Sequence, residues 1–373
     1  MTRSLPGAPD LHLGAKRPPM RLTSRMQGAL TSVGVNVIPW IPTAVRRVLV
    51  RGRSVVIDGN TLDPTLQLML SGLRAVGIDG LVVDDDPELS RASLREQIVG
   101  LPGPQVHVEV DELSLPGPAG GIAARHYRPA ATETRPPVLV FYHGGGWSIG
   151  DLDTYDALCR LICRDAGIHV LSVDYRLAPE HPAPAGIEDA YAAFKWAFEH
   201  AEELGAAPGR VAVGGDSAGG NLAAVVSQRA RDEGGPAPVL QWLIYPRTDF
   251  TAHTRSLGLF SRGFVLTKRD IDWFESQYLR GSGIDRSDPR ISPLLAESLS
   301  GLAPALIAVA GFDPLRDEGE AYATALRDAG TAVDLRYMGS LTHGFINLFK
   351  LGGGSLRATN ELISALRAHL SRV

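Results

Sequence analysis

The sequence contains few cysteines, and its charges of opposite sign nearly balance. Only two of its 373 residues are cysteine, Cys159 and Cys163, so the fold does not depend on a disulfide framework. Their spacing of four residues places both on one face of a helix, turned toward the core, and no Cys or His partner stands nearby at ligand spacing. We therefore expect no metal site. A net charge of −4 gives no support for a nucleic-acid partner.

The N-terminal region lacks the features of a signal peptide and of a membrane-spanning helix. Residues 1–20 contain four prolines and no continuous apolar core, and residues 33–50 are interrupted by Asn36, two prolines and two arginines. Two interpretations of 33–50 stay open: a helix packed on the body of the protein, or an interfacial segment with Trp40 at a membrane surface. We expect a cytoplasmic protein, with weak peripheral membrane contact as an alternative. The sequence leaves a homodimer open.

Apolar runs alternate with helical patterns along most of the chain. This alternation predicts an α/β fold with a mostly parallel sheet covered by helices on both faces. The continuous apolar stretches Val138–Tyr142 and Ala305–Ala310 are typical of central strands buried on both faces. Other strands are expected at 106–115, 122–127, 170–173, 211–213, 239–245 and 333–337, and helices at 62–76, 90–99, 155–166, 187–204, 318–329 and 360–370.

A long insertion interrupts this alternation between the strands expected at 239–245 and 305–310. It is rich in apolar and aromatic side chains, among them Phe260, Trp273 and Phe274. Long insertions in α/β folds lie at the carboxyl ends of strands, where ligands bind. We therefore expect this segment to form an apolar lid.

The chemistry of the chain centres on Gly215-Asp216-Ser217-Ala218-Gly219, which stands between a short apolar strand and an apolar helix. This G-x-S-x-G pattern is typical of the sharp strand-to-helix turn that presents a serine nucleophile. The backbone of such a serine is strained, and flanking glycines remove the clashes that β-carbons would make. The following helix directs free N–H groups and its positive dipole end beside the hydroxyl. We predict that Ser217 is the nucleophile.

A serine nucleophile also needs N–H donors that stabilise the oxyanion of the tetrahedral intermediate. His143-Gly144-Gly145-Gly146 directly follows an expected central strand, at the position of an oxyanion loop. Glycine lets this backbone approach the substrate and turn its N–H groups inward. We predict that the donors are the N–H groups of Gly145 and Gly146, together with that of Ala218 after the nucleophile.

The acid and the base follow from the chain order nucleophile, acid, base that is typical of G-x-S-x-G hydrolases. His343 lies in the loop after the last expected strand, whereas His369 lies in the terminal helix among charged and small residues. Asp313 directly follows an apolar strand. Its rivals Asp317 and Glu318 stand at the start of a helix, where acidic residues commonly serve as caps. We predict Asp313 as the acid and His343 as the base.

Together with the runs Asp174–Pro182 and Asp313–Gly319 and with His343-Gly344-Phe345, these motifs resemble the hormone-sensitive lipase family of carboxylesterases, and most of all its mycobacterial Lip-type members. The resemblance covers about residues 60–373. It implies an α/β-hydrolase fold, a Ser217–Asp313–His343 triad, no cofactor, and esters with short to medium acyl chains as substrates. An amidase or thioesterase with the same triad, and a ligand-binding protein on the same fold, are the alternatives.

The resemblance also implies how the chain is divided. Residues 1–60 form a partly helical N-terminal extension, and residues 61–102 form the N-terminal helices of a cap. Residues 103–246 and 291–373 form the α/β-hydrolase core. Residues 247–290 are the insertion that completes the cap.

Overall fold

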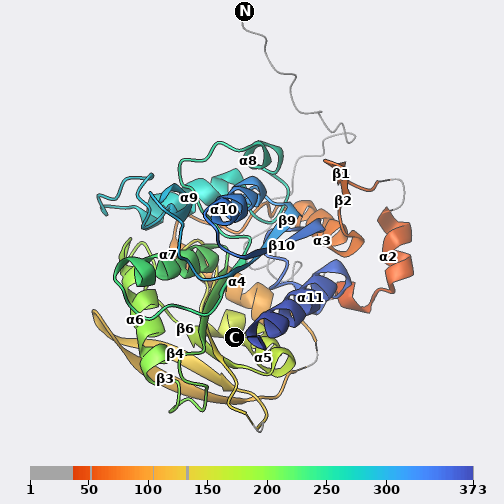
Figure 1. Cartoon of the computed structure of the whole chain (residues 1–373). Coiled ribbons are helices and arrows are strands. Elements are labelled where there is room, and N and C mark those ends of the chain that lie inside the picture. The colour runs from red at the N-terminus through yellow and green to blue at the C-terminus, as the bar shows by residue number, and fades with distance from the viewer. Residues whose placement is uncertain (1–36, 51–52, 104, 132–133, 373) are drawn as a thin grey trace, which may run out of the picture.

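An eight-stranded sheet crosses the centre of the protein (Figure 1), and its strands follow the order β10-β9-β8-β7-β5-β6-β4-β3. The computed structural model describes residues 37–50, 53–103, 105–131 and 134–372. Strands β5 to β10 pair in parallel, whereas β3 and β4 form an antiparallel hairpin, and β4 is antiparallel to β6. The strands are β3 (Glu109–Gly117), β4 (Gly120–Arg128), β5 (Val138–Tyr142), β6 (His169–Val173), β7 (Val211–Asp216), β8 (Gln241–Ile244), β9 (Ala305–Phe312) and β10 (Val333–Thr342).

Helices cover both faces of this sheet, as the alternating pattern predicts. Helices α5 and α11 contribute to the apolar core on one face, and α6, α7 and α10 contribute to the core on the other. Both cysteines are buried on α5. The prediction of a mostly parallel α/β fold is confirmed. The helices are α5 (Leu152–Ala166), α6 (Ala185–Glu199), α7 (Ala218–Asp232), α10 (Arg316–Asp328) and α11 (Gly353–Leu370).

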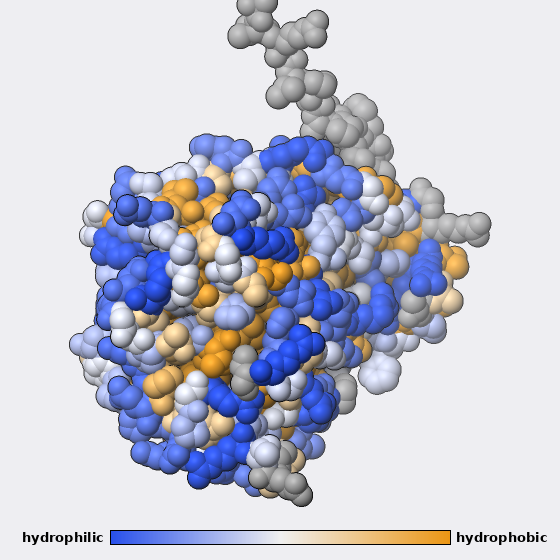
Figure 2. Space-filling view, viewed as in Figure 1, coloured by the Kyte–Doolittle hydropathy of each residue, from blue (hydrophilic) through white to orange (hydrophobic). Residues whose placement is uncertain are grey.

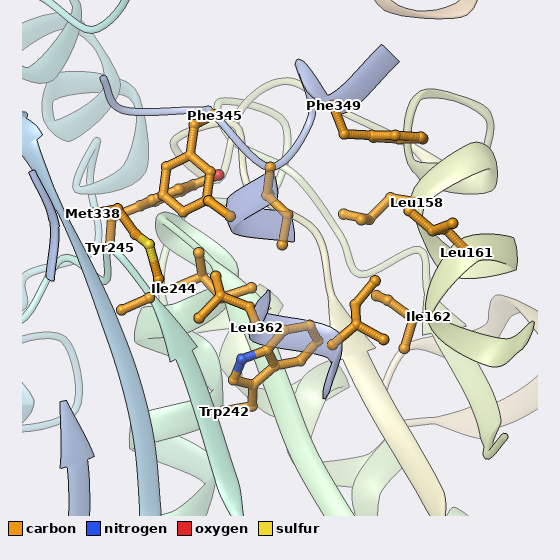
Figure 3. Packing of buried hydrophobic residues seen from close by; sticks show 14 of the residues in the cluster. Leu158, Leu161, Ile162, Trp242, Ile244, Tyr245, Met338, Phe345, Phe349 and Leu362 are labelled. Atoms are coloured by element: carbon orange, nitrogen blue, oxygen red, sulfur yellow. The ribbon is translucent and has the colours of Figure 1, made fainter. Parts of the chain in front are cut away.

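Side chains of the central strands alternate between these two cores. Leu139 of β5 belongs to the core with α5 and α11, and its neighbour Val140 belongs to the core with α6 and α7. Figure 3 shows the first of these cores, where Trp242 of β8 lies beside Leu362 of α11 and Ile162 of α5. Because both faces of the strands are buried, the sheet gives a rigid platform for the loops at its edge.

Three α-helices, a 3₁₀ helix and a hairpin precede the sheet in the described part of the N-terminal region, and residues 1–36 of the predicted extension lie outside the described residues. The hairpin adds to the prediction, which contained no strand here. Asp58 (φ 52°) and Gly59 (φ 75°) form its turn in the left-handed conformations of a two-residue loop. The elements are η1 (Ile38–Trp40), α2 (Thr43–Val50), β1 (Val56–Ile57), β2 (Asn60–Thr61), α3 (Pro64–Ala75) and α4 (Pro87–Val99).

The segment between β8 and β9 contains two α-helices and a 3₁₀ helix. The division of the chain into extension, cap helices, core and insertion stays a prediction.

No helix among the described residues is long and apolar enough to cross a membrane. In the same part of the chain, no group of three or more His, Cys, Asp or Glu side chains could hold a metal ion. The elements of the insertion region are α8 (Arg255–Leu259), α9 (Lys268–Tyr278) and η2 (Pro293–Leu295).

Candidate active site

The predicted site residues lie at one edge of the sheet, because each follows the carboxyl end of a parallel strand. Ser217 directly follows β7, Asp313 directly follows β9, and His343 directly follows β10. The glycine-rich loop that begins at His143 follows β5, which pairs with β7. Since β7, β8, β9 and β10 are consecutive neighbours, segments far apart in the sequence meet here.

The structure brings the three predicted side chains together in a hydrogen-bonded row. Nε2 of His343 lies 2.9 Å from Oγ of Ser217, and Nδ1 lies 2.8 Å from Oδ2 of Asp313. The other carboxylate oxygen of Asp313 accepts the N–H of Leu315 at 2.8 Å. Asp313 and His343 are buried, whereas Ser217 is partly exposed. This arrangement can move a proton from a hydroxyl to an imidazole whose other nitrogen faces a carboxylate.

The other acids and histidines near the site make different contacts. Asp317 accepts the N–H of Ser256, and Glu318 forms an ion pair with Arg247. Nε2 of His369 lies 3.1 Å from a carboxylate oxygen of Asp334, away from the row.

The backbone around Ser217 has the strain that its motif predicts. Ser217 has φ 55° and ψ −116°, a conformation that L-residues rarely adopt. A β-carbon on Gly215 would lie 2.3 Å from the carbonyl oxygen of Tyr142, and one on Gly219 would lie 1.9 Å from the same atom. Both glycines are therefore needed for the close approach of this turn to β5.

The loop after β5 has a geometry that only glycine accommodates at two positions. Gly145 has φ 112°, and Gly146 has φ 56°, where an added β-carbon would overlap the ring of Phe274. Among the described residues, no hydrogen bond uses the N–H group of Gly145, Gly146 or Ala218. Ala218 is the first residue of α7, so its N–H lies at the positive end of the helix dipole. These three N–H groups are therefore free to donate to a bound group, and Gly145 and Gly146 line the same pocket as Ser217.

A buried carboxylate beside the nucleophile supports this loop. Oδ1 of Asp216 accepts the N–H of Gly144 at 2.8 Å, and Oδ2 accepts the hydroxyls of Tyr155 and Tyr245, both at 3.1 Å. The side-chain amide of Asn347 donates to Oδ2 at 3.3 Å. The pKa of Asp216 lies above its usual value, because burial raises it more than the His343 imidazole and these donors lower it. Sequence reasoning does not find this network, because its members lie far apart in the chain.

An apolar pocket opens above Ser217. Its walls come from α3, α4 and α9, from the residues between α8 and α9, and from the loop after β5. Most of its exposed surface is apolar, although Arg74, Asp79, Gln97, Arg247 and Glu275 also line it, so the pocket suits a small molecule that carries an apolar group. The apolar side chains that line it include Met69, Leu70, Leu73, Leu94, Ile98, Ile149, Leu266, Ile271, Phe274 and Leu315.

A buried ion cluster fixes α9, and with it one wall of this pocket. Arg247, which is 5% exposed, pairs with Glu275 of α9 at 2.5 Å and with Glu318 of α10. Burial raises the pKa of Glu318 to about 7, against the opposite effect of the Arg247 guanidinium. The guanidinium of Arg286 forms a second ion pair with the carboxylate of Glu275, at 2.5 Å. The cluster holds the ring of Phe274 against the glycine-rich loop.

Comparison with known proteins agrees with this geometry. Residues 139–347 match a family model described as the alpha/beta hydrolase fold. Over the full length of both chains, the protein is 73% identical to the carboxylic ester hydrolase LipN of Mycobacterium tuberculosis. The chain belongs to the hormone-sensitive lipase family of carboxylesterases. This member of the hormone-sensitive lipase family is therefore a carboxylic ester hydrolase.

Two further proteins that match the chain are less similar to it than LipN is. The esterase LipI of Mycobacterium tuberculosis is 44% identical, over 83% of this chain and 95% of LipI. The solved ester hydrolase EH1AB1, from the metagenome of Lake Arreo, is 40% identical with a TM-score of 0.77, over 83% of this chain and 99% of that one. The predicted family and the predicted α/β-hydrolase fold are confirmed.

Proposed function

We propose that this carboxylic ester hydrolase is a serine esterase in which Ser217 attacks the ester carbonyl. The observation that carries the proposal is the row of hydrogen bonds of 2.9 and 2.8 Å from Ser217 through His343 to Asp313. His343 takes the hydroxyl proton as the Oγ–carbonyl bond forms, and then gives it to the departing alcohol. Asp313 holds the proton on Nδ1 and stabilises the imidazolium. Water, activated by the same imidazole, releases the acid from the acyl-enzyme.

We assign the oxyanion hole to the N–H groups of Gly145, Gly146 and Ala218. The support is that these donors have no acceptor among the described residues, that Gly145 and Gly146 line the same pocket as Ser217, and that Ala218 directly follows Ser217. A donor of this kind typically lowers the barrier by about 3 kcal/mol. The contact from Asp216 to Gly144 makes that carboxylate a positioning group for the loop rather than a second base.

The substrate class that fits is an ester with a short to medium acyl chain. Most of the lining surface of the pocket is apolar, and its walls come in part from α3, α4 and α9. A short to medium acyl chain can bury its carbons against these walls.

We expect hydrolysis of p-nitrophenyl esters to be fastest for short to medium acyl chains and to fall for long ones. Leu94→Trp narrows the α4 wall, so we expect kcat/KM for the longer half of the series to fall at least about tenfold relative to the shorter half. Leu89→Trp is the matched control, since Leu89 is on the same helix but exposed. Activity that rises through the longest chains would instead indicate a lipase, and an unchanged profile in Leu94→Trp would remove α4 from the acyl pocket.

The cytoplasmic location and the homodimer stay predictions. Cell fractionation tests the first, and sedimentation velocity at several protein concentrations tests the second.

A further inference from the structure

Exposed apolar side chains gather on the short stretch from residue 37 to residue 50, called here the 37–50 segment. Of the twelve large apolar side chains that are most exposed in the described part of the chain, five lie in this segment. Trp40 is 78% exposed and Val48 is 67% exposed. Figure 2 shows apolar surface at the edge of the molecule where α2 stands in Figure 1. The five are Val37, Trp40, Val45, Val48 and Leu49.

The orientation of this segment is fixed by a buried arginine. Arg46 is 5% exposed and donates to the carbonyl oxygens of Pro39 and Ile41 at 3.0 and 2.7 Å, which ties η1 to α2. It also donates to Oγ1 of Thr65 on α3 at 2.9 Å and to the carbonyl oxygen of Leu351 at 3.4 Å. Because Arg46 faces inward, the residues on the opposite side of α2 face outward.

The outward face of α2 has the pattern of a helix that lies in an interface. Val45, Val48 and Leu49 follow the i, i+3, i+4 spacing of one helix face, and Arg47 on the same helix is exposed. A membrane-surface helix combines an apolar face with basic residues on its polar face and an aromatic side chain near the headgroups. Trp40 supplies the aromatic side chain.

Positive charge lies beside the 37–50 segment. Arg46, Arg47 and Arg357 of α11 line a cavity beside α2, where Asp63 is the acidic residue. Asp63 caps α3 and lies 3.8 Å from Arg357. The sequence has the same bias on a larger scale. Residues 1–53 contain nine Lys and Arg and one acidic residue, a net charge of +8, whereas residues 54–373 carry a net charge of −12.

We propose that the exposed apolar face of the 37–50 segment docks onto the surface of a lipid bilayer that contains anionic lipids. The apolar face enters the headgroup boundary, and the exposed Arg47 and Arg357 meet the anionic headgroups. A second copy of the chain fits less well, because pairing this face with itself would bring two strongly positive regions together. The proposal goes beyond the proposed esterase function and does not depend on it.

Docking would bring the candidate site close to the lipid surface. The 37–50 segment packs on α3, and Met69, Leu70 and Leu73 of α3 line the pocket above Ser217. An apolar ester dissolved in the bilayer would then have a short path to the pocket.

The test is partitioning of the full-length protein onto vesicles of phosphatidylcholine alone and of phosphatidylcholine mixed with phosphatidylglycerol. We expect the wild-type protein to prefer the mixed vesicles, and this preference to weaken as salt is raised. The triple variant Trp40→Ser, Val48→Ser, Leu49→Ser should partition at least about tenfold less, since three apolar side chains no longer enter the interface. A matched triple variant, with serine at the exposed Val83, Leu89 and Leu295, should partition like wild type. Thermal unfolding shows that each variant is folded.

Several results would overturn the proposal. One is equal partitioning of the wild-type protein onto both kinds of vesicle. Another is full binding by the Trp40, Val48 and Leu49 variant. A third is a wild-type dimer in sedimentation velocity that this variant loses, without binding to either vesicle, because the occupant of the face would then be a second copy.

Discussion

Replacement of Ser217 by alanine is expected to lower kcat on the order of 10⁶-fold while the protein stays folded. The reason is that the acyl group is proposed to bond to Oγ of Ser217, which lies 2.9 Å from Nε2 of His343, and alanine has no oxygen at this position. The substitution removes one oxygen from a partly exposed position, so the free energy of unfolding should change little. Single-turnover and steady-state hydrolysis of a p-nitrophenyl ester measure the loss, and thermal unfolding reports the fold.

Ser227→Ala is the matched control for this variant. Ser227 is also on α7, and its buried hydroxyl makes no hydrogen bond among the described residues. Its removal should leave kcat within about twofold of wild type, because the hydroxyl contacts neither the pocket nor the triad. A Ser217→Ala protein that keeps a substantial fraction of wild-type turnover would show that another residue is the nucleophile.

Replacement of Asp313 by asparagine should lower kcat by about 10⁴-fold, through the tautomer of His343 rather than through loss of the fold. Oδ1 of Asp313 accepts the N–H of Leu315, so an asparagine would keep its oxygen there and turn its NH₂ group toward Nδ1 of His343. That NH₂ group requires an unprotonated Nδ1, which places the proton on Nε2. Nε2 can then no longer accept the proton of Ser217. The pH–rate profile and kcat of the variant measure this effect.

Asp317→Asn tests whether the loss is specific to Asp313. Asp317 is the nearest rival in the sequence, and its carboxylate contacts the N–H of Ser256 and the guanidinium of Arg316 instead. We expect its kcat to stay within about threefold of wild type, with a change in stability of about 1 kcal/mol. A larger loss of kcat in Asp317→Asn than in Asp313→Asn would exchange the roles of the two acids.

The sheet, and the meeting of Ser217, Asp313 and His343 at one of its edges, could be predicted because both depend on short-range patterns. The apolar run Val138–Tyr142 has the same bounds as β5. In a strand that is buried on both faces every residue is apolar, so the first and last apolar residues mark its ends. Ser217, Asp313 and His343 each directly follow a strand, so the order of the strands was enough to bring them to one edge. Helices α3 and α4 begin within three residues of the predicted starts, and Asp63 and Asp86 cap them.

Long-range contacts decide what the sequence did not predict. Helix α11 begins at Gly353, seven residues before the predicted start, because the distant carboxylate of Asp63 accepts the N–H of Gly354. Strand β10 continues past Tyr337 to Thr342 through an irregularity, since Gly311 allows the carbonyl of Gly339 to come close. Neither partner is a neighbour in the sequence.

The sequence of the N-terminal hairpin contains a local turn signal, which the prediction of a partly helical extension did not use. Asp58-Gly59 is the typical pair for a two-residue hairpin turn, and both residues have positive φ. The hairpin is also stabilised by ion pairs and a hydrogen bond to residues that are far away in the sequence. Asp58 pairs with Arg255 of α8 and Arg316 of α10, and Asn60 donates to the hydroxyl of Tyr337.

The most direct test of the central claim is to locate the acyl group on the enzyme. A p-nitrophenyl ester is mixed with enzyme at comparable concentration, the reaction is quenched in acid within the first turnover, and the digested peptides are weighed by mass spectrometry. The account predicts one acyl group per chain, on the peptide that contains Ser217, and none in Ser217→Ala. An acyl group on a different residue, or turnover with no acylated peptide at any time, would contradict the proposed mechanism.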